Sequence, residues 1–360
     1  MKAPFPYFGG KTRVASLVWD ALGDVGHYIE PFCGSCAVLL LRPPFGEGTH
    51  SETVNDADSH ICNVWRALKW KPDEVAEWCD WPVNHDDLRA RKIVLNRDEP
   101  TLHARLVADD MFCDPKMAGY YIWCASCWIG SGLTCPGQIP HLGDAGNGVH
   151  APGKRPHLAH AGMGVHAPGQ RPHLIGVGMG VHAPGKRPHL SGAGMGDFGE
   201  PFDRHIFEWF RELQERLRYV RVVVGDWKQV CGGNWQANNF GTCGIFFDPP
   251  YSHGIGRDNG IYVHESATVA RECAAWAIER GKLPEYRIVL AGYIDEHQDL
   301  IDAGWRVHQW AAQGGYAHQA RSDDSPGKTN RHREALFFSP HCLSADAVHA
   351  GPLFEEAEND

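Results

Sequence analysis

Short apolar runs alternate along this chain with segments that have the three-to-four-residue spacing of amphipathic helices. The apolar runs are rich in β-branched and aromatic residues, as buried strands are. The predicted strands are 28–30, 52–56, 220–224, 244–247, 286–291 and 336–339, and the predicted helices are 11–22, 37–41, 58–69, 117–129, 202–217, 267–279 and 296–303. Strands that alternate with helices predict an α/β fold with a largely parallel sheet.

The tetrapeptide Asp248-Pro249-Pro250-Tyr251 follows the apolar run 244–247 directly. Two prolines end a strand because neither has an N–H to donate. Open α/β sheets bind ligands in loops at the carboxyl ends of their strands. The Asp248 carboxylate and the Pro249 carbonyl could both accept hydrogen bonds from an exocyclic amine, while Tyr251 stacks on the base. A duplex base would have to be flipped out to reach them. The alternative is an ordinary strand exit with a buried tyrosine.

The segment Tyr7-Phe8-Gly9-Gly10-Lys11 places two glycines and a lysine at the start of a helical pattern. A helix start of this type can hold an anion or a carboxylate. The six-residue glycine frame of a P-loop is missing, so that nucleotide motif is excluded. The alternative is a solvent-exposed Lys11 on a capped helix.

Two further segments have the form of a nucleotide site. Glu30-Pro31-Phe32-Cys33-Gly34-Ser35-Cys36 joins a short strand to a helix through a glycine turn, although any βα turn could look similar. Asn55-Asp56-Ala57-Asp58 ends the second predicted strand, where an acid can bind ribose hydroxyls. Asp58 is explained as the N-cap of the helix that follows. Asp56 is not needed for capping and is the better ligand candidate.

Composition is that of a globular protein with a sizeable core. The chain has 360 residues, of which 43% are hydrophobic and 22% charged, enough for one large domain or two. No apolar run is long enough for a membrane span, and residues 1–4 lack a signal-peptide pattern. We therefore expect an intracellular, cytoplasmic protein without a membrane partner.

The twelve cysteines follow no disulfide framework and predict reduced thiols. Cys124 and Cys127, with Cys113 and Cys135 nearby, could form a zinc site. The spacings fit no common set of zinc ligands, so thiols packed in the core of a helix are the preferred interpretation. We expect no metal.

A 16-residue repeat occupies the middle of the chain, with copies at 148–158, 164–174 and 180–190 and a degenerate copy at 132–142. Each copy has too little apolar surface for a core of its own. It could be a basic insertion on DNA phosphates, a stack of turns docked on a recognition domain, or a duplicated loop without a role. A metal site at its histidines is disfavoured. The candidate DNA-contacting residues are Lys154, Arg155, Arg171, Lys186 and Arg187.

The net charge of −10 argues mildly against a nucleic-acid partner, but it is unevenly distributed. Residues 145–196 contain five Lys or Arg and no acid, whereas residues 343–360 contain five acids and no Lys or Arg. An acidic tail can therefore conceal a basic binding face in the total.

Taken together, the motifs at 7–11, 30–36, 55–58 and 248–251 resemble the Dam-like (alpha-class) adenine-N6 DNA methyltransferases. Their order along the chain also matches: cofactor motifs, a variable recognition segment, and then the catalytic motif. Residues 222–227, which end in Asp226 and Trp227, resemble that family's strand near the cofactor adenine. The resemblance covers roughly residues 4–66 and 205–340. It departs at Cys36, where the family usually has glycine.

The resemblance implies a Rossmann-like S-adenosylmethionine-dependent methyltransferase domain with an inserted target-recognition segment. The catalytic domain would comprise 1–70 and 200–342, the insertion 71–199 with its repeats at 132–196, and an acidic tail 343–360. The implied catalytic residues are Asp248, Pro249, Pro250 and Tyr251, and the implied cofactor-binding residues are Tyr7, Lys11, Glu30, Phe32, Gly34, Asp56, Asp226 and Asp248.

The implied activity is site-specific methyl transfer from S-adenosylmethionine to the N6 amine of adenine in double-stranded DNA, with base flipping, as in restriction-modification systems of bacteria or phages. The same residues could serve the N4 amine of cytosine. A rival of another class is a non-catalytic DNA-binding protein with a decayed pocket. The intact sequence at 248–251 argues against that rival.

Overall fold

The structure is a computed structural model of the chain. It describes residues 1–7, 11–44, 50–81, 85–128, 133–134, 206–232, 241–250, 268–310 and 333–344. The predictions made for Phe8–Gly10, the repeats, Tyr251 and most of the acidic tail lie outside these residues.

The described residues form a seven-stranded, mostly parallel sheet of order β3-β2-β1-β4-β5-β7-β6. Strand β7 runs antiparallel to both of its neighbours, β5 and β6. The strands are β1 His27–Glu30, β2 Ser51–Asp56, β3 Val220–Val224, β4 Cys243–Phe247, β5 Tyr286–Tyr293, β6 Arg306–Gln309 and β7 Glu334–Phe338. This arrangement confirms the predicted Rossmann-like α/β fold.

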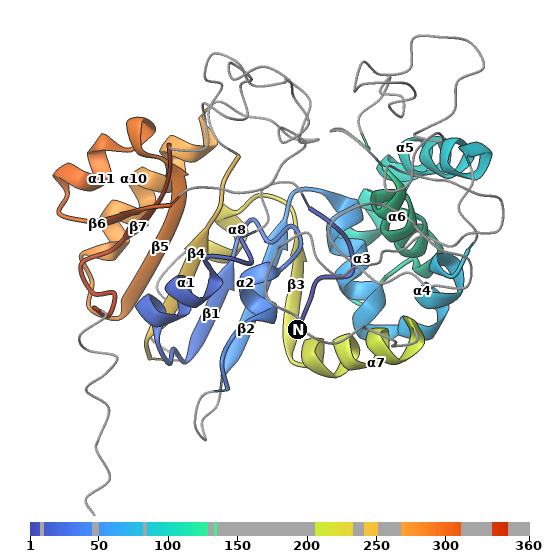
Figure 1. Ribbon diagram of the computed structural model, residues 1–360, viewed down its shortest axis with the longest axis horizontal. Helices are drawn as coiled ribbons and strands as arrows, with labels where there is room; N and C mark the ends of the chain where they lie inside the picture. Colours follow the sequence, from blue (N-terminus) through green and yellow to red (C-terminus); the bar gives the residue numbers. More distant parts are fainter. Residues whose placement is uncertain are drawn as a thin grey trace, which may run out of the picture.

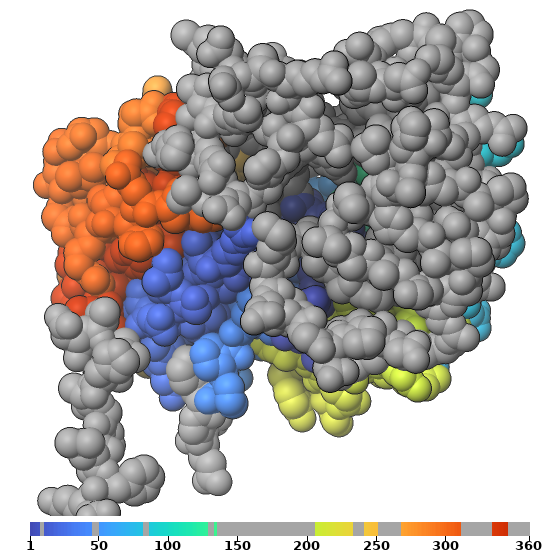
Figure 2. Space-filling view, in the orientation of Figure 1, coloured from blue at the N-terminus to red at the C-terminus, as the bar shows by residue number. Residues whose placement is uncertain are grey.

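Helices flank the sheet and form a second group beyond β3 (Figure 1). The first set is α1 Ala15–Leu22, α2 Ala37–Leu40, α8 Lys228–Cys231, α10 Val269–Gly281 and α11 Gln298–Asp302, with a 3₁₀ turn at Ile294–Glu296. The second group is α3 Ser59–Trp70, α4 Pro72–Cys79, α5 His85–Ala108, α6 Pro115–Cys127 and α7 Ile206–Leu217. In Figure 2 the blue N-terminal elements lie between the orange C-terminal elements and the yellow-green α7.

Side chains of the central strands alternate between two cores, as the twofold period of a strand requires. In β4, Phe246 packs in the core that contains α1, α2 and α3, whereas Ile245 and Phe247 pack in the core that contains α8, α10 and α11. Strand β5 alternates in the same way. Both faces of the sheet are therefore covered, which explains why its strands read as nearly continuous apolar runs.

The second helical group is attached to the sheet through the outer edge of β3. Lys69 Nζ of α3 donates to the Val220 carbonyl at 2.8 Å, and the Arg66 guanidinium donates to the Val222 carbonyl at 3.3 Å. These two cations satisfy carbonyls that an edge strand would otherwise leave unpaired.

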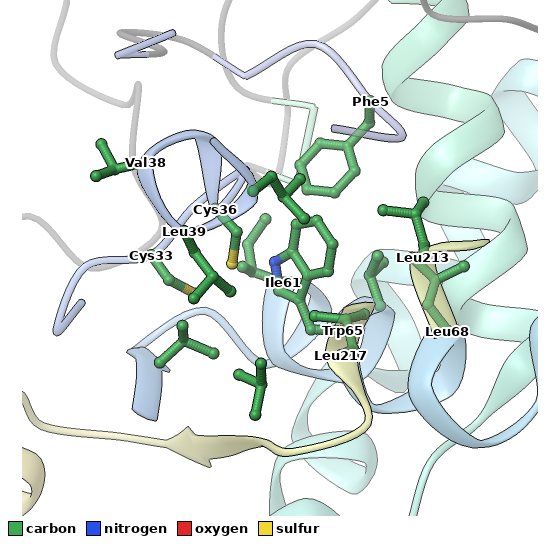
Figure 3. Close-up of a cluster of buried hydrophobic side chains, with 14 of the residues drawn as sticks. Phe5, Cys33, Cys36, Val38, Leu39, Ile61, Trp65, Leu68, Leu213 and Leu217 are labelled. Carbon is green, nitrogen blue, oxygen red and sulfur yellow. The ribbon is translucent and has the colours of Figure 1, made fainter. Parts of the chain in front are cut away.

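Trp65 of α3 links this group to the loop after β1. Its ring is fully buried among Ile61, Leu68, Leu213 and their neighbours (Figure 3). Its indole Nε1–H donates to the Gly34 carbonyl at 2.8 Å.

Most of the predicted elements are confirmed, with shifted ends. Asp58 caps α3, as expected, by accepting the His60 N–H at 2.8 Å. The helix predicted from residue 11 begins only at Ala15, because residues 12–14 form a turn. The helix predicted at 296–303 divides into a 3₁₀ turn and the short α11. Strand β6 was not predicted.

Candidate active site

The order of the sheet reverses between β1 and β4, so their carboxyl ends border a switch point at which open α/β sheets bind ligands. Strands β3, β2, β1 and β4 are parallel neighbours. The loops that follow them therefore emerge at one edge. These loops carry the motifs containing Gly34, Asp56, Asp226 and Asp248.

The loop after β1 is a tight turn covered by Tyr7. The Cys36 N–H donates to the Cys33 carbonyl at 2.6 Å, and the Cys33 N–H donates to the Asn55 carbonyl at 2.9 Å. Gly34 has a φ of +43°, and a Cβ built on it would lie 2.4 Å from the Tyr7 ring. Only glycine fits here, which brings Tyr7 directly against the loop.

Asp56 lies at the carboxyl end of β2 and accepts hydrogen bonds from backbone N–H groups. Its Oδ2 accepts from Gly34 at 2.9 Å, and its Oδ1 accepts from Asp58 at 3.0 Å. Burial raises the pKa of this carboxyl to about 6, against the hydrogen bonds that favour its charged form. The Ala57 N–H is a third backbone donor, and the carboxylate keeps lone-pair capacity for a ligand hydroxyl beside these bonds.

Asn55 ties three of the loops together, a role that the sequence did not reveal. Its side-chain amide donates to the Pro31 carbonyl at 2.9 Å and to the Gly225 carbonyl at 3.0 Å. The Gly225 N–H in turn donates to the Asp56 carbonyl at 2.9 Å. These hydrogen bonds hold the loops after β1, β2 and β3 in fixed positions relative to one another. The exposed Asp226 lies at their rim, where it accepts the Lys228 N–H at 2.8 Å.

Lys11 and Asp248 meet at the end of β4. Lys11 Nζ lies 2.8 Å from Asp248 Oδ2, and the two side chains are 5% and 22% exposed. The strand ends at Phe247, as the two prolines predicted. Lys11 is therefore a buried cation facing the catalytic motif rather than a solvent-exposed residue.

Glu30 is placed differently from the other predicted cofactor residues. It is 2% exposed, and its Oε2 accepts from the Tyr28 hydroxyl at 3.1 Å and from the Leu39 N–H at 3.2 Å. Burial is the main cause that raises its pKa to about 8. These two hydrogen bonds place Oε2 of Glu30 between β1 and α2, beneath the loop.

Aromatic rings pack in the core beneath the motif at 248–251. Phe32 lies 6.4 Å from Phe247, measured between ring centroids, and Trp227 lies 5.7 Å from Phe247 in an edge-on arrangement. Phe32 was predicted to line the pocket. Trp227 and Phe247 were not, because they read as ordinary strand-end residues.

Among the described side chains, no group of three or more His, Cys, Asp and Glu could hold a metal ion. Cys124 and Cys127 are buried in the core on α6, and Cys135 lies outside the described residues. Within the same part of the chain, no helix combines the length and the apolar character needed to cross a membrane.

The site thus combines a carboxylate for hydroxyl groups, a buried cation for an anion, aromatic rings in the core beneath, and a second carboxylate next to a rigid proline carbonyl. This set suits a charged nucleoside-like cofactor and an amine acceptor.

A search of curated proteins found no match to the chain. A family model described as "D12 class N6 adenine-specific DNA methyltransferase" matches residues 7–88, which supports a methyltransferase that acts on adenine in DNA. This match confirms the resemblance for residues 7–88, which are similar to the D12 class N6 adenine-specific DNA methyltransferases.

Proposed function

We propose that the protein transfers a methyl group from S-adenosylmethionine to the N6 amine of adenine at specific sites in double-stranded DNA. The observation that carries the proposal is the 2.8 Å contact between Lys11 and Asp248, beside the loop in which Gly34 binds Asp56. It joins the predicted cofactor half of the site, which the family model covers, to the catalytic motif, which that model does not reach.

Different residues of the site would contact different parts of the cofactor. Asp56, whose carboxylate keeps lone-pair capacity, would accept from a ribose hydroxyl, and Asp226 at the rim would accept from the adenine amine. Lys11 and Tyr7 would contact the methionine end, where the carboxylate needs a cation. Glu30 acts indirectly, because its bond to the Leu39 N–H fixes the start of α2 beneath the loop.

Asp248 and the Pro249 carbonyl would accept the two hydrogens of the target amine and so direct its lone pair. S-adenosylmethionine supplies an electrophilic methyl group. The amine would lose one proton on methylation, and Asp248, which would already accept a hydrogen bond from that amine, would take the proton. Stacking by Tyr251 remains a prediction. Most of the acceleration would come from positioning.

The ion pair between Lys11 and Asp248 implies an order of binding. A cofactor carboxylate at Lys11 competes with Asp248 for the same cation. Its arrival would free the Asp248 carboxylate for the amine, so the cofactor should bind before the DNA base. A decayed pocket would have no reason to keep this buried pair, which disfavours a non-catalytic DNA-binding protein.

The test is to incubate the protein with tritium-labelled S-adenosylmethionine and duplex DNA of mixed sequence, and to separate the labelled nucleosides. We expect label in N6-methyladenine, and none with the Asp248→Ala variant as control. Label in N4-methylcytosine would replace the proposal with the cytosine alternative. Absence of label in either base would contradict both.

The basic repeats are proposed to contact DNA phosphates, on the strength of five cations without an intervening acid. Near-identical copies suit a regular backbone better than a varied base sequence. Deleting 164–179 removes one period. The variant should methylate the same site, while log affinity falls less steeply with log salt, because fewer counterions are released. A changed methylation site would show base reading, and an unchanged slope would favour a duplicated loop without a role.

A further inference from the structure

The loop after β1 carries two cysteines that the proposed reaction does not use. Cys33 and Cys36 flank Gly34 and Ser35, and we refer to this pair as the loop dithiol. The same spacing recurs at Cys124 and Cys127 within α6, which we refer to as the helix dithiol. The two pairs differ in backbone conformation, since one lies in a turn and the other in a helix.

The backbone of the loop dithiol brings its two cysteines together in one turn. The 2.6 Å hydrogen bond from the Cys36 N–H to the Cys33 carbonyl closes a turn. The ends of such a turn lie within about 7 Å between Cα atoms, and disulfides span about 4.4–6.8 Å. Cys124 and Cys127 instead lie within one turn of helix α6, where the backbone hydrogen bonds of the helix hold them.

Both thiols of the loop dithiol are shielded in the resting structure. Cys33 is 3% exposed and Cys36 is fully buried, in the cluster that contains Leu39 and Trp65 (Figure 3). Burial raises the pKa of Cys36 to about 11, so the reactive thiolate is scarce. Oxidation therefore requires the loop to open, and whatever holds the loop closed controls it.

The contacts that hold this loop are those proposed to bind the cofactor. The Gly34 N–H, between the two cysteines, donates to Asp56, and the Tyr7 ring packs on Gly34 with no room for a Cβ. Cys36 also has a φ of +49°, and among the residues that the structure describes it is the one non-glycine residue with a positive φ. The loop is thus strained and tightly coupled to Asp56 and Tyr7.

We propose that Cys33 and Cys36 form a reversible disulfide whose formation weakens binding of the cofactor; the second half of this inference rests on the proposed function. The oxidant is a small disulfide such as oxidised glutathione. One thiolate of the pair attacks it and releases one glutathione thiolate. The second cysteine then displaces the other glutathione, so two electrons pass to the oxidant and two glutathione thiols leave.

Bond formation must move the loop. The two sulfur atoms must come together into a bond of about 2 Å. Gly34 lies between them and cannot shift toward Tyr7, so its N–H must change its position relative to Asp56. The oxidised loop should therefore bind the cofactor more weakly, and bound cofactor should protect the thiols.

The first test is chemical. Wild-type protein and the Cys33→Ser and Cys124→Ser variants are incubated with oxidised glutathione, digested without reduction and analysed by mass spectrometry. We expect a disulfide between Cys33 and Cys36 in the wild type and in Cys124→Ser but not in Cys33→Ser, reversed by dithiothreitol and slowed by S-adenosylmethionine. Mixed disulfides alone, or no modification of this pair, would overturn the proposal.

The second test is calorimetric titration of S-adenosylmethionine into oxidised and reduced wild type. We expect oxidation to weaken binding about tenfold or more, which corresponds to about 1.4 kcal/mol, and the Cys33→Ser variant to show no such difference. Equal affinities would overturn the effect on the cofactor. Failure of the reduced wild type to bind would instead contradict the proposed function, and the disulfide analysis would still decide whether the pair forms a disulfide.

Discussion

Strand β2 carries an acid at each end, and the two are satisfied in opposite ways. Glu52, near its start, accepts from the Arg42 guanidinium at 3.1 Å and from the Arg216 guanidinium at 2.6 Å. Asp56, at its end, accepts from the backbone N–H groups of Gly34 and Asp58. The two acids are four residues apart on the same strand.

The difference supports a structural role for Glu52 and the proposed ligand-binding role for Asp56. Each arginine at Glu52 also donates to a backbone carbonyl, of Val25 or of Leu39, so this network joins several elements and is complete without a ligand. At the other end of the strand, the carboxylate of Asp56 is held by backbone N–H groups alone, which leaves lone-pair capacity for a ligand. We conclude that the amino end of the sheet stabilises the fold, while the carboxyl end keeps polar groups available for chemistry.

The largest expected effect is on catalysis at the carboxyl end. Asp248→Ala removes the acceptor for the target amine, so methyl incorporation should fall at least about 100-fold. Circular dichroism should show that the fold is retained. Asp73→Ala, which removes a surface acid paired with Arg211, is the matched control and should keep full activity. A variant at Asp248 that retains most of its turnover would show that the role assigned to this residue is wrong.

The next effect concerns pH and Glu30. Its folded-state pKa of about 8 lies above the ordinary 4.5, so the folded state holds the proton more tightly than the unfolded state. Its stabilising contribution is complete below pH 4.5 and is lost as the pH rises through 8. Glu30→Gln keeps an oxygen that can accept from Tyr28 and Leu39 but cannot ionise.

Urea unfolding near pH 5 and near pH 8.5 should show a smaller loss of stability in Glu30→Gln than in the wild type, by on the order of 3 kcal/mol. Asp56 also makes the fold less stable as the pH rises to about 6, but it does so equally in both proteins. The difference in stability loss between the two proteins therefore reports on Glu30. Equal losses in the two proteins would contradict the inward placement of this carboxyl.

A smaller effect is expected at the amino end of the sheet. Glu52→Gln removes the counter-charge of Arg216 and the nearer of two counter-charges of Arg42, which should lower the free energy of unfolding by about 2–3 kcal/mol. The matched control is Asp73→Asn, whose ion pair with Arg211 has both side chains at least half exposed, and it should leave the free energy of unfolding close to the wild-type value. If Glu52→Gln unfolds like the wild type, the network does not stabilise the fold.

The smallest effect tests strain in the loop after β1. Cys36→Gly and Cys36→Ala both remove the thiol, but only glycine adopts a φ of +49° without penalty. The glycine variant should be more stable than the alanine variant by about 1 kcal/mol in thermal unfolding. Equal stabilities would mean that the left-handed conformation carries no strain.

Features governed by neighbours in sequence were predictable. The two prolines fixed the end of β4, the cap at Asp58 fixed the start of α3, and the order of the motifs indicated the fold. Five predicted site residues lie at the carboxyl edge of the sheet, because each adjoins the end of a parallel strand or packs on a loop there. They are Tyr7, Lys11, Gly34, Asp56 and Asp248.

Features that depend on distant partners were not predictable. Asn55 bonds to Gly225, 170 residues away, and no local pattern indicates this. The inward turn of Glu30 depends on Tyr28 and on the start of α2, which only packing brings together. Strand β6 is mostly exposed and pairs only with β7, so its four residues lack the apolar run that indicates a strand.

The most direct test of the difference between the two ends of β2 is calorimetric titration of S-adenosylmethionine into Asp56→Ala and Glu52→Gln side by side. Loss of the hydrogen bonds at Asp56 should weaken binding by about 1.5–3 kcal/mol, whereas the folded fraction of Glu52→Gln should bind with wild-type affinity. Unchanged affinity in Asp56→Ala, or an equal loss in both variants, would contradict the assignment of the carboxyl end of the sheet as the cofactor site.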